Sequence, residues 1–289
     1  MTIKEKGYTH WEGELEEKKF PWWPITRFGI LSTFRKKFFK IFFFGSLIPA
    51  VVFLVGIYIS ERLDDFRTMI QRPERLLNVD PGYFKSYFTG DFLLFMMVMI
   101  LVFCGAGLIS DDMKHNSLQL YFSRPLKKNQ YFLGKAAVVL FFLFMLTLVP
   151  GLVFFFMKLI FAGSFQFFTT YPWLPLSVIG YSLLVTVFFS LYTLFLSSLS
   201  KNRRYVAILI FSVYFFSDIL FGIFYGIFRN QHFALLSLKV NLQQIGALIF
   251  NQKLPYSISS LYSFLIIFSI SFLAAVYLRK KVKGVSIIK

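Results

Sequence analysis

Residues 107–135 read GLISDDMKHNSLQLYFSRPLKKNQYFLGK and separate two apolar runs that are each long enough to cross a bilayer. Asp111 and Asp112 come first, and we expect them at a helix N-terminus, where the helix dipole favours negative charge. A short helix is predicted over 117–122, and Pro125 ends it and opens the next helix, because proline is tolerated at the first helical position. An ordinary solvated loop is the alternative, but such a loop does not require so many neighbouring apolar side chains, namely Leu118, Leu120, Tyr121 and Phe122.

The composition around this stretch is that of an integral membrane protein. The 289 residues are 57% hydrophobic and 21% aromatic, and their mean hydropathy is +0.65. A soluble domain has too little interior, relative to its surface, to bury that many apolar side chains. The net charge of +17 would suggest nucleic acid binding in a soluble protein. Here the first explanation is the retention of Lys and Arg on the cytoplasmic side of a membrane, so we expect no nucleic acid partner.

Six apolar runs of about 20 residues or more predict an all-α polytopic membrane protein with six transmembrane helices. Of the 31 Lys and Arg residues, 22 fall on the side of the two termini and nine on the other side. The positive-inside rule therefore predicts a multi-pass protein of the plasma (inner) membrane whose N- and C-termini are cytoplasmic. The approximate spans are 38–59, 91–110, 135–161, 176–199, 206–228 and 258–278.

The chain divides around these spans. We expect residues 1–37 to form a cytoplasmic tail that ends in a helix, 38–278 the transmembrane domain, and 279–289 a basic cytoplasmic tail. Apolar residues recur every three or four positions after Pro24, with basic residues between them, which indicates an amphipathic helix lying on anionic lipid. A frayed tail is the alternative. The side chains assigned to this interfacial helix are Phe28, Leu31, Phe34, Arg35, Lys36 and Lys37.

Two of the outer loops are too apolar to be simple turns. Residues 61–77 carry apolar side chains at near-helical spacing, which predicts a short outer amphipathic helix. Residues 233–250 are too polar for a span and too apolar for a free loop. We expect one or two short helices there, either at the outer surface or partly re-entrant where protein shields the backbone.

The predicted spans contain few polar side chains that suggest a path for a substrate. Asp218 is the one acid inside a span, and a carboxylate in lipid is a functional candidate because its burial is costly. The alternative is that Asp218 faces the bundle and accepts hydrogen bonds from a neighbouring Ser or Tyr, or is protonated. Ser190 and Thr193 belong to a stripe of small polar residues in the fourth span, which indicates either close helix packing or the lining of a path.

The stretch at 107–135 resembles the hallmark of ABC transporter permeases of the ABC-2 type. That family has an acidic pair after the second span, then a small residue and Leu, a Ser-Arg-Pro step, and Leu-Gly-Lys entering the third span. The family more often has Glu-Glu and Gly-Thr-Leu where this chain has its two Asp residues and Asn116-Ser117-Leu118. The six spans, the surface helix and the outer helices are also similar. The matching positions are Asp111, Asp112, Ser117, Leu118, Ser123, Arg124, Pro125, Leu133, Gly134 and Lys135.

The resemblance implies a machine of two permeases and two ATPases, in which residues 111–124 act as a coupling helix that docks in a groove of the cytoplasmic ATPase. The chain contains no Gly-x4-Gly-Lys-Ser/Thr loop, so it is not expected to be an enzyme, and ATP and Mg would be bound by the partner subunit. The chain itself is expected to hold no cofactor or metal. Besides the ATPase, the expected partners are a second permease and membrane lipids. The residues assigned to coupling are Asp111, Asp112, Ser117, Leu118, Tyr121, Phe122 and Arg124.

Export is the family expectation for the direction of transport. The rival hypothesis is a membrane-embedded enzyme or a receptor-like scaffold that has no ATPase partner. Such a protein would require convergent polar or metal-binding side chains inside the spans, and Asp218 is the only charged candidate of that kind near their middle.

Overall fold

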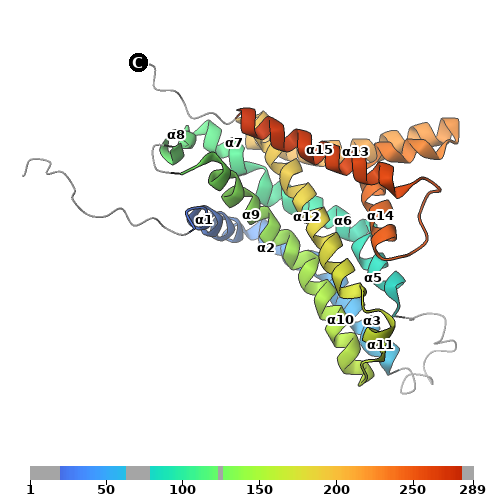
Figure 1. Ribbon diagram of the computed structural model, residues 1–289. Helices are drawn as coiled ribbons and strands as arrows, with labels where there is room; N and C mark the ends of the chain where they lie inside the picture. The colour runs from blue at the N-terminus through green and yellow to red at the C-terminus, as the bar shows by residue number, and fades with distance from the viewer. Residues whose placement is uncertain (1–19, 63–78, 123–125, 282–289) are drawn as a thin grey trace, which may run out of the picture.

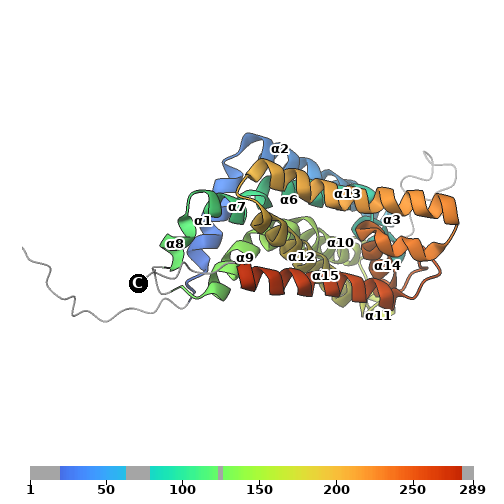
Figure 2. The same cartoon turned by 90° about the horizontal axis from the view of Figure 1, so that it is seen from above.

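The computed structural model describes residues 20–62, 79–122 and 126–281, and every regular element in these ranges is helical. Six helical stretches are long and apolar enough to cross a membrane. They run side by side, with α1 and α8 gathered at one end (Figure 2). The six predicted spans are thereby confirmed, with bounds of Lys37–Glu61, Pro81–Lys114, Lys128–Ala162, Leu174–Leu199, Arg203–Phe228 and Ser260–Lys281.

The spans differ from the predicted ranges chiefly because three of them consist of two or three helices in succession. The end of the bundle that carries α1, α8 and the last described turn of α15 is called the α8 end below (Figure 1). The helices are α1 (Trp23–Phe34), α2 (Lys37–Ser46), α3 (Ile48–Glu61), α5 (Pro81–Phe88), α6 (Asp91–Gly105), α7 (Gly107–Lys114), α8 (Ser117–Phe122), α9 (Lys128–Leu146), α10 (Leu148–Ala162), α11 (Gln166–Thr170), α12 (Leu174–Leu199), α13 (Arg203–Phe228), the 3-10 helix η2 (Gln231–Leu236), α14 (Leu238–Ile249) and α15 (Ser260–Lys281).

The third span shows how a break between two helices is stabilised. Pro150 has no N–H group, so it cannot donate to the carbonyl of Leu146, four residues earlier. The helix is interrupted at Thr147, between α9 and α10. The hydroxyl of Tyr87 in α5 donates to the Leu146 carbonyl at 2.7 Å. A side chain from another span therefore satisfies the backbone group that the proline leaves without an intrahelical partner.

Helix α12 is the central helix of the bundle, and it contacts α6, α7, α9, α10, α13, α14 and α15. Its Ser and Thr side chains are small, so neighbouring backbones approach it closely. At Gly105 of α6, an added Cβ would collide with the side chain of Thr193. The polar stripe of the fourth span therefore lies in helix contacts, with Ser182, Thr186, Ser190, Thr193 and Ser197 each at most 2% exposed.

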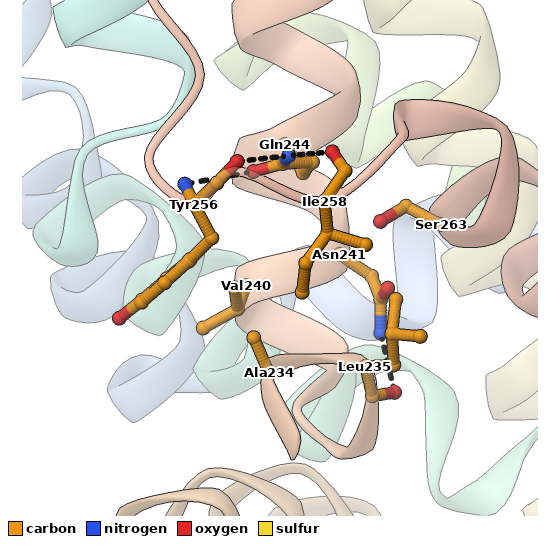
Figure 3. A pocket seen from close by; sticks show the side chains of 8 residues that line it. All are labelled: Ala234, Leu235, Val240, Asn241, Gln244, Tyr256, Ile258 and Ser263. Atoms are coloured by element: carbon orange, nitrogen blue, oxygen red, sulfur yellow. Dashed lines mark hydrogen bonds between the residues drawn. The ribbon is translucent and has the colours of Figure 1, made fainter. Parts of the chain in front are cut away.

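Residues 233–250 form two short helices, η2 and α14, as predicted, and much of α14 is buried against α13 and α15. Figure 3 shows how α14 is fastened to the segment before α15. The side-chain amide of Gln244 donates to the carbonyls of Tyr256 at 2.9 Å and Ile258 at 2.8 Å. The space between these side chains is too small for a water molecule. Most of the helix predicted at 61–77 falls outside the described residues.

The N-terminal helix exists, but it is shorter and less amphipathic than predicted. Helix α1 ends at Phe34, Lys36 is extended, and Lys37 already opens α2 and the first span. Phe28 and Leu31 are exposed, at 70% and 51%, as is Arg35. Phe34 instead packs edge-on against the rings of Phe39, Phe43 and Phe142, inside the bundle.

Candidate functional site

Asp111 and Asp112 lie in the second half of α7, so the prediction that they sit at a helix N-terminus is wrong. The dipole at this end of a helix disfavours negative charge, and other contacts must hold the two acids. The reason is that the second span does not end before the two acids. It continues past a break at Ala106 as α7, which contains both of them and ends at Lys114.

Asp112 is held by two side chains of α9. Lys135 places its ammonium 2.6 Å from Asp112 Oδ2, and the two side chains are only 10% and 13% exposed. The hydroxyl of Tyr131 donates to the same carboxylate oxygen at 2.7 Å. The acid pair and the Leu-Gly-Lys step, 23 residues apart in the sequence, thus meet in space. Their contact fixes α7 against α9.

The turn between α7 and α8 explains one departure from the family pattern. Asn116 has φ of 54°, in the left-handed region. Glycine adopts this conformation without steric cost, and Asn tolerates it better than most other residues. The Asn that stands where the family more often has Gly therefore preserves the turn that starts the next helix. The predicted short helix over 117–122 is confirmed as α8. The prediction that Pro125 opens the next helix is wrong, because α9 begins at Lys128.

Among the described side chains of α8, the exposed apolar one is Leu120, which is not among the residues assigned to coupling from the sequence. Leu120 is 72% exposed, whereas Ser117 and Leu118 are half-buried. Tyr121 turns inward, with its ring 5.3 Å from that of Tyr131 between centroids. Burial and the charge of Asp112 raise the pKa of Tyr121. Tyr121, one of the residues assigned to coupling, therefore faces α9 rather than outward. The side chain of Phe122 and all of Arg124 lie outside the described residues.

Helix α1 packs beside this segment through a glycine. At Gly134 of α9, an added Cβ would lie 2.9 Å from the carbonyl oxygen of Trp22 and 3.0 Å from Ile25. The hydroxyl of Thr26 donates to the Gly134 carbonyl at 3.0 Å. Gly134 thus allows the backbone of α1 to approach α9. The sequence places this glycine in the Leu-Gly-Lys step but does not show that α1 is its partner.

A cavity of about 140 Å³ lies between α1, α7, α8 and α9. Its lining combines apolar side chains of α1 with charged side chains of the motif. The pKa of Lys36 is lowered by burial and by the nearby charge of Arg203. The lining includes Phe28, Ser32, Lys36, Asp111, Asp112 and Lys135.

The break between α6 and α7 contains a side chain of α12. In a continuous α-helix the N–H of Ile109 would donate to the carbonyl of Gly105. Here the N–H groups of Ile109 and Ser110 both donate to Ser197 Oγ, at 3.0 Å and 3.2 Å. The Ser197 hydroxyl in turn donates to the Ala106 carbonyl at 2.9 Å. A side chain inserted in this way is a recognised cause of a helix break.

The other residues assigned to a path also take part in packing. Ser190 donates to the carbonyl of Ala136 in α9 at 3.4 Å, and Thr193 lies against Gly105 of α6. Asp218 is bound to α14: its carboxylate lies 2.8 Å from the ammonium of Lys239 and accepts from the hydroxyl of Ser237 at 2.9 Å. The reading in which Asp218 accepts hydrogen bonds from a Ser is borne out, and the sequence alone did not reveal its basic partner.

Comparison with known proteins identifies the family to which the chain belongs. A search of the curated proteins finds no match. The family model described as "ABC-2 family transporter protein" matches residues 33–218, which include the first four spans and the entire α7–α8 segment. The match covers more than half of the 289 residues. The chain therefore belongs to the ABC-2 transporter family, and it is a transmembrane permease.

Proposed function

We propose that this permease is driven by a separate cytoplasmic ATP-binding cassette ATPase, which docks on α8. The observation that carries the proposal is the geometry of α8 itself. The helix begins at the left-handed Asn116 turn and directs Leu120 outward with 72% exposure, while α7 behind it is fixed to α9 by the ion pair of Asp112 and Lys135. A short helix on a rigid base, with an apolar side chain exposed, suits docking in a groove.

The charge distribution supports a cytoplasmic α8 end. By order along the sequence, 22 of the 31 Lys and Arg residues fall in the segments on the same side of the predicted spans as α8, and Lys and Arg are retained on the cytoplasmic side. The N- and C-termini are then cytoplasmic as well, and α1 lies in the headgroup layer beside the docking surface. In this orientation a cytoplasmic ATPase reaches α8 directly.

Family membership supports two further parts of the proposal. The permease pairs with a second permease, which is a copy of itself or a related chain, and the pair exports its substrate. ATP binding draws the two ATPase subunits together, and their movement displaces α8 and rearranges the spans. The chain supplies the path, and the partner subunit binds ATP and Mg.

Asp218, Ser190 and Thr193 are proposed to affect the path indirectly, by holding α13, α9 and α6 in place around α12. The contact of Asp218 with Lys239 supports this role, because this partly buried ion pair joins α13 to α14. Asp218→Asn should lower export while the amount of protein in the membrane stays the same. Unchanged export at an unchanged protein level would contradict a role in transport.

The docking proposal is tested by purifying the tagged permease in mild detergent and identifying a bound protein that carries a nucleotide-binding loop and hydrolyses ATP. Leu120→Asp should reduce the amount of bound ATPase at least tenfold, because it places a charge in an apolar contact. Leu236→Asp is the matched control: Leu236 is 45% exposed and belongs to η2 at the opposite end. Equal binding by wild type and Leu120→Asp would exclude docking through α8.

A further inference from the structure

The break between α6 and α7 joins the proposed docking segment to the centre of the bundle. Helix α8 follows α7 directly, and α7 begins at this break. On the other side of the break, α12 extends from Leu199 near the α8 end to Leu174 at the opposite end of the bundle (Figure 1). A displacement of α8 must therefore pass this point if it is to reach the far half of α12.

Ser197 of α12 uses all of its hydrogen-bonding capacity at the break. A hydroxyl group has one donor and two acceptor positions. Ser197 donates to Ala106 and accepts from Ile109 and Ser110, and its side chain is fully buried. In surroundings that exclude water, each of these bonds is costly to lose. The hydroxyl thus replaces part of the helix's own hydrogen-bond ladder with bonds to a different helix.

Two basic side chains from other elements bind the last turn of α6, just before the break. Lys36, in the link between α1 and α2, places its ammonium 3.3 Å from the carbonyl oxygen of Phe103. Arg203, at the start of α13, donates to the same oxygen at 3.2 Å. Charged donors form stronger hydrogen bonds than neutral ones. The last turn of α6 is thereby bound to the residue before the first span and to the start of the fifth span. A pivot at Ala106 then moves α7 relative to α6, together with α9, to which the Asp112–Lys135 pair fixes it.

We propose that Ser197 is the positioning residue that transmits movement of α8 to α12. This inference rests on the proposed function, since it requires an ATPase that moves α8. When α7 pivots at Ala106, the three bonds of Ser197 oblige α12 to follow. Without the hydroxyl of Ser197, the Ala106 carbonyl still accepts from the Ser110 hydroxyl at 2.7 Å, and α7 then moves without α12.

The neighbouring residue supplies a matched control. Ser198 is also fully buried in α12, but its hydroxyl donates only to Phe195 of its own helix, at 2.7 Å. Ser197→Ala and Ser198→Ala therefore remove the same group from the same helix at the same burial. Only the first change removes bonds to α6 and α7. Ser197→Thr retains the hydroxyl and should behave as wild type.

The test is hydrogen–deuterium exchange of the permease–ATPase complex in lipid nanodiscs, with and without ATP and vanadate. In wild type and in Ser198→Ala, nucleotide should change deuterium uptake both in 107–122 and in 174–186. In Ser197→Ala, nucleotide should still change the deuterium uptake of residues 107–122. The nucleotide-dependent change in the uptake of residues 174–186 should be at least threefold smaller than in wild type. If Ser197→Ala does not yield folded protein, Ser197→Cys, with its weak thiol donor, replaces it.

Two results would overturn the inference. One is that nucleotide changes the deuterium uptake of residues 174–186 in Ser197→Ala as much as it does in wild type. The other is a wild-type complex in which nucleotide changes 107–122 but not 174–186. Failure of the proposed function gives a different result, because the wild-type permease would then bind no ATPase, or nucleotide would leave 107–122 unchanged.

Discussion

Replacing Lys135 by Met removes the cation that lies within 4 Å of Asp112 in the described part of the chain. The side chains of the pair are 10% and 13% exposed, so the charge left on Asp112 is largely cut off from water. Breaking a buried ion pair by removing one partner costs about 3–5 kcal/mol. The hydroxyl of Tyr131 still donates to Asp112, so we expect the lower end of this range, about 3 kcal/mol.

The double variant Asp112→Asn with Lys135→Met supplies the critical comparison. Replacing both charges removes the unpaired charge, and such replacements are often nearly neutral. The double variant should therefore lie within about 1 kcal/mol of wild type. Lys128→Met at the exposed start of α9 serves as a control and should change the free energy of unfolding by no more than about 0.5 kcal/mol.

The assay is equilibrium unfolding in mixed micelles of dodecyl sulfate and a mild detergent, followed by loss of helical circular dichroism. The two single variants and the double variant form a cycle, and the coupling free energy is the quantity that it isolates. If the double variant loses as much stability as the two single variants added together, the pair does not fix α7 to α9, and the account of the rigid base behind α8 is wrong.

Three further predictions use the same unfolding measurement. Tyr87→Phe leaves the Leu146 carbonyl without its donor and should lower the free energy of unfolding by about 1–3 kcal/mol. An unchanged midpoint of unfolding would mean that this hydroxyl does not stabilise the break between α9 and α10. Gly134→Ala places a methyl group against the backbone of α1 and should lower the free energy of unfolding by about 1–3 kcal/mol. Gly180→Ala in α12 is the control and should not destabilise, because an added Cβ there meets nothing within 4 Å. Equal effects of the two variants would refute the close approach of α1. Burial lowers the pKa of Lys239, but the hydrogen bond and charge of Asp218, with the charge of Asp91, outweigh it and raise the pKa above the ordinary 10.5. A raised lysine pKa contributes stability below the unfolded value that is lost as pH rises through the folded value. As pH rises above 10.5 through the raised pKa of Lys239, the wild type should therefore lose more stability than Lys239→Met. A parallel loss in both proteins would contradict the role of this pair.

Local patterns in the sequence predict the helical architecture well. Apolar runs identify the six spans, because a helix in lipid must satisfy its backbone internally and present apolar side chains. The short helix at 117–122 follows from a cluster of apolar residues before Pro125. Its start at Asn116 is a matter of local backbone conformation, which the residue type itself favours.

The sequence predicts less well which way a side chain faces and where a helix begins or ends. Tyr121 and Leu120 are neighbours in a helix of six residues, and no period can be read over so short a length. The inward position of Tyr121 depends on Tyr131 and Lys135 in another helix. The acid pair was assigned to a helix start because the end of the second span had been placed too early in the sequence.

The sequence by itself determined the class of protein, the number of spans and the position of the family motif at 107–135. These depend on the transfer of side chains from water to lipid and on residue types at fixed spacing. Only the tertiary structure decided the partners of its polar groups: Lys135 for Asp112, Lys239 for Asp218, and Ser197 within the break at Ala106. These partners lie on different helices, and the rotation and depth of each helix are set by packing against all of its neighbours. No local pattern records that outcome, so the contacts that would carry movement through this permease appear only in the folded chain.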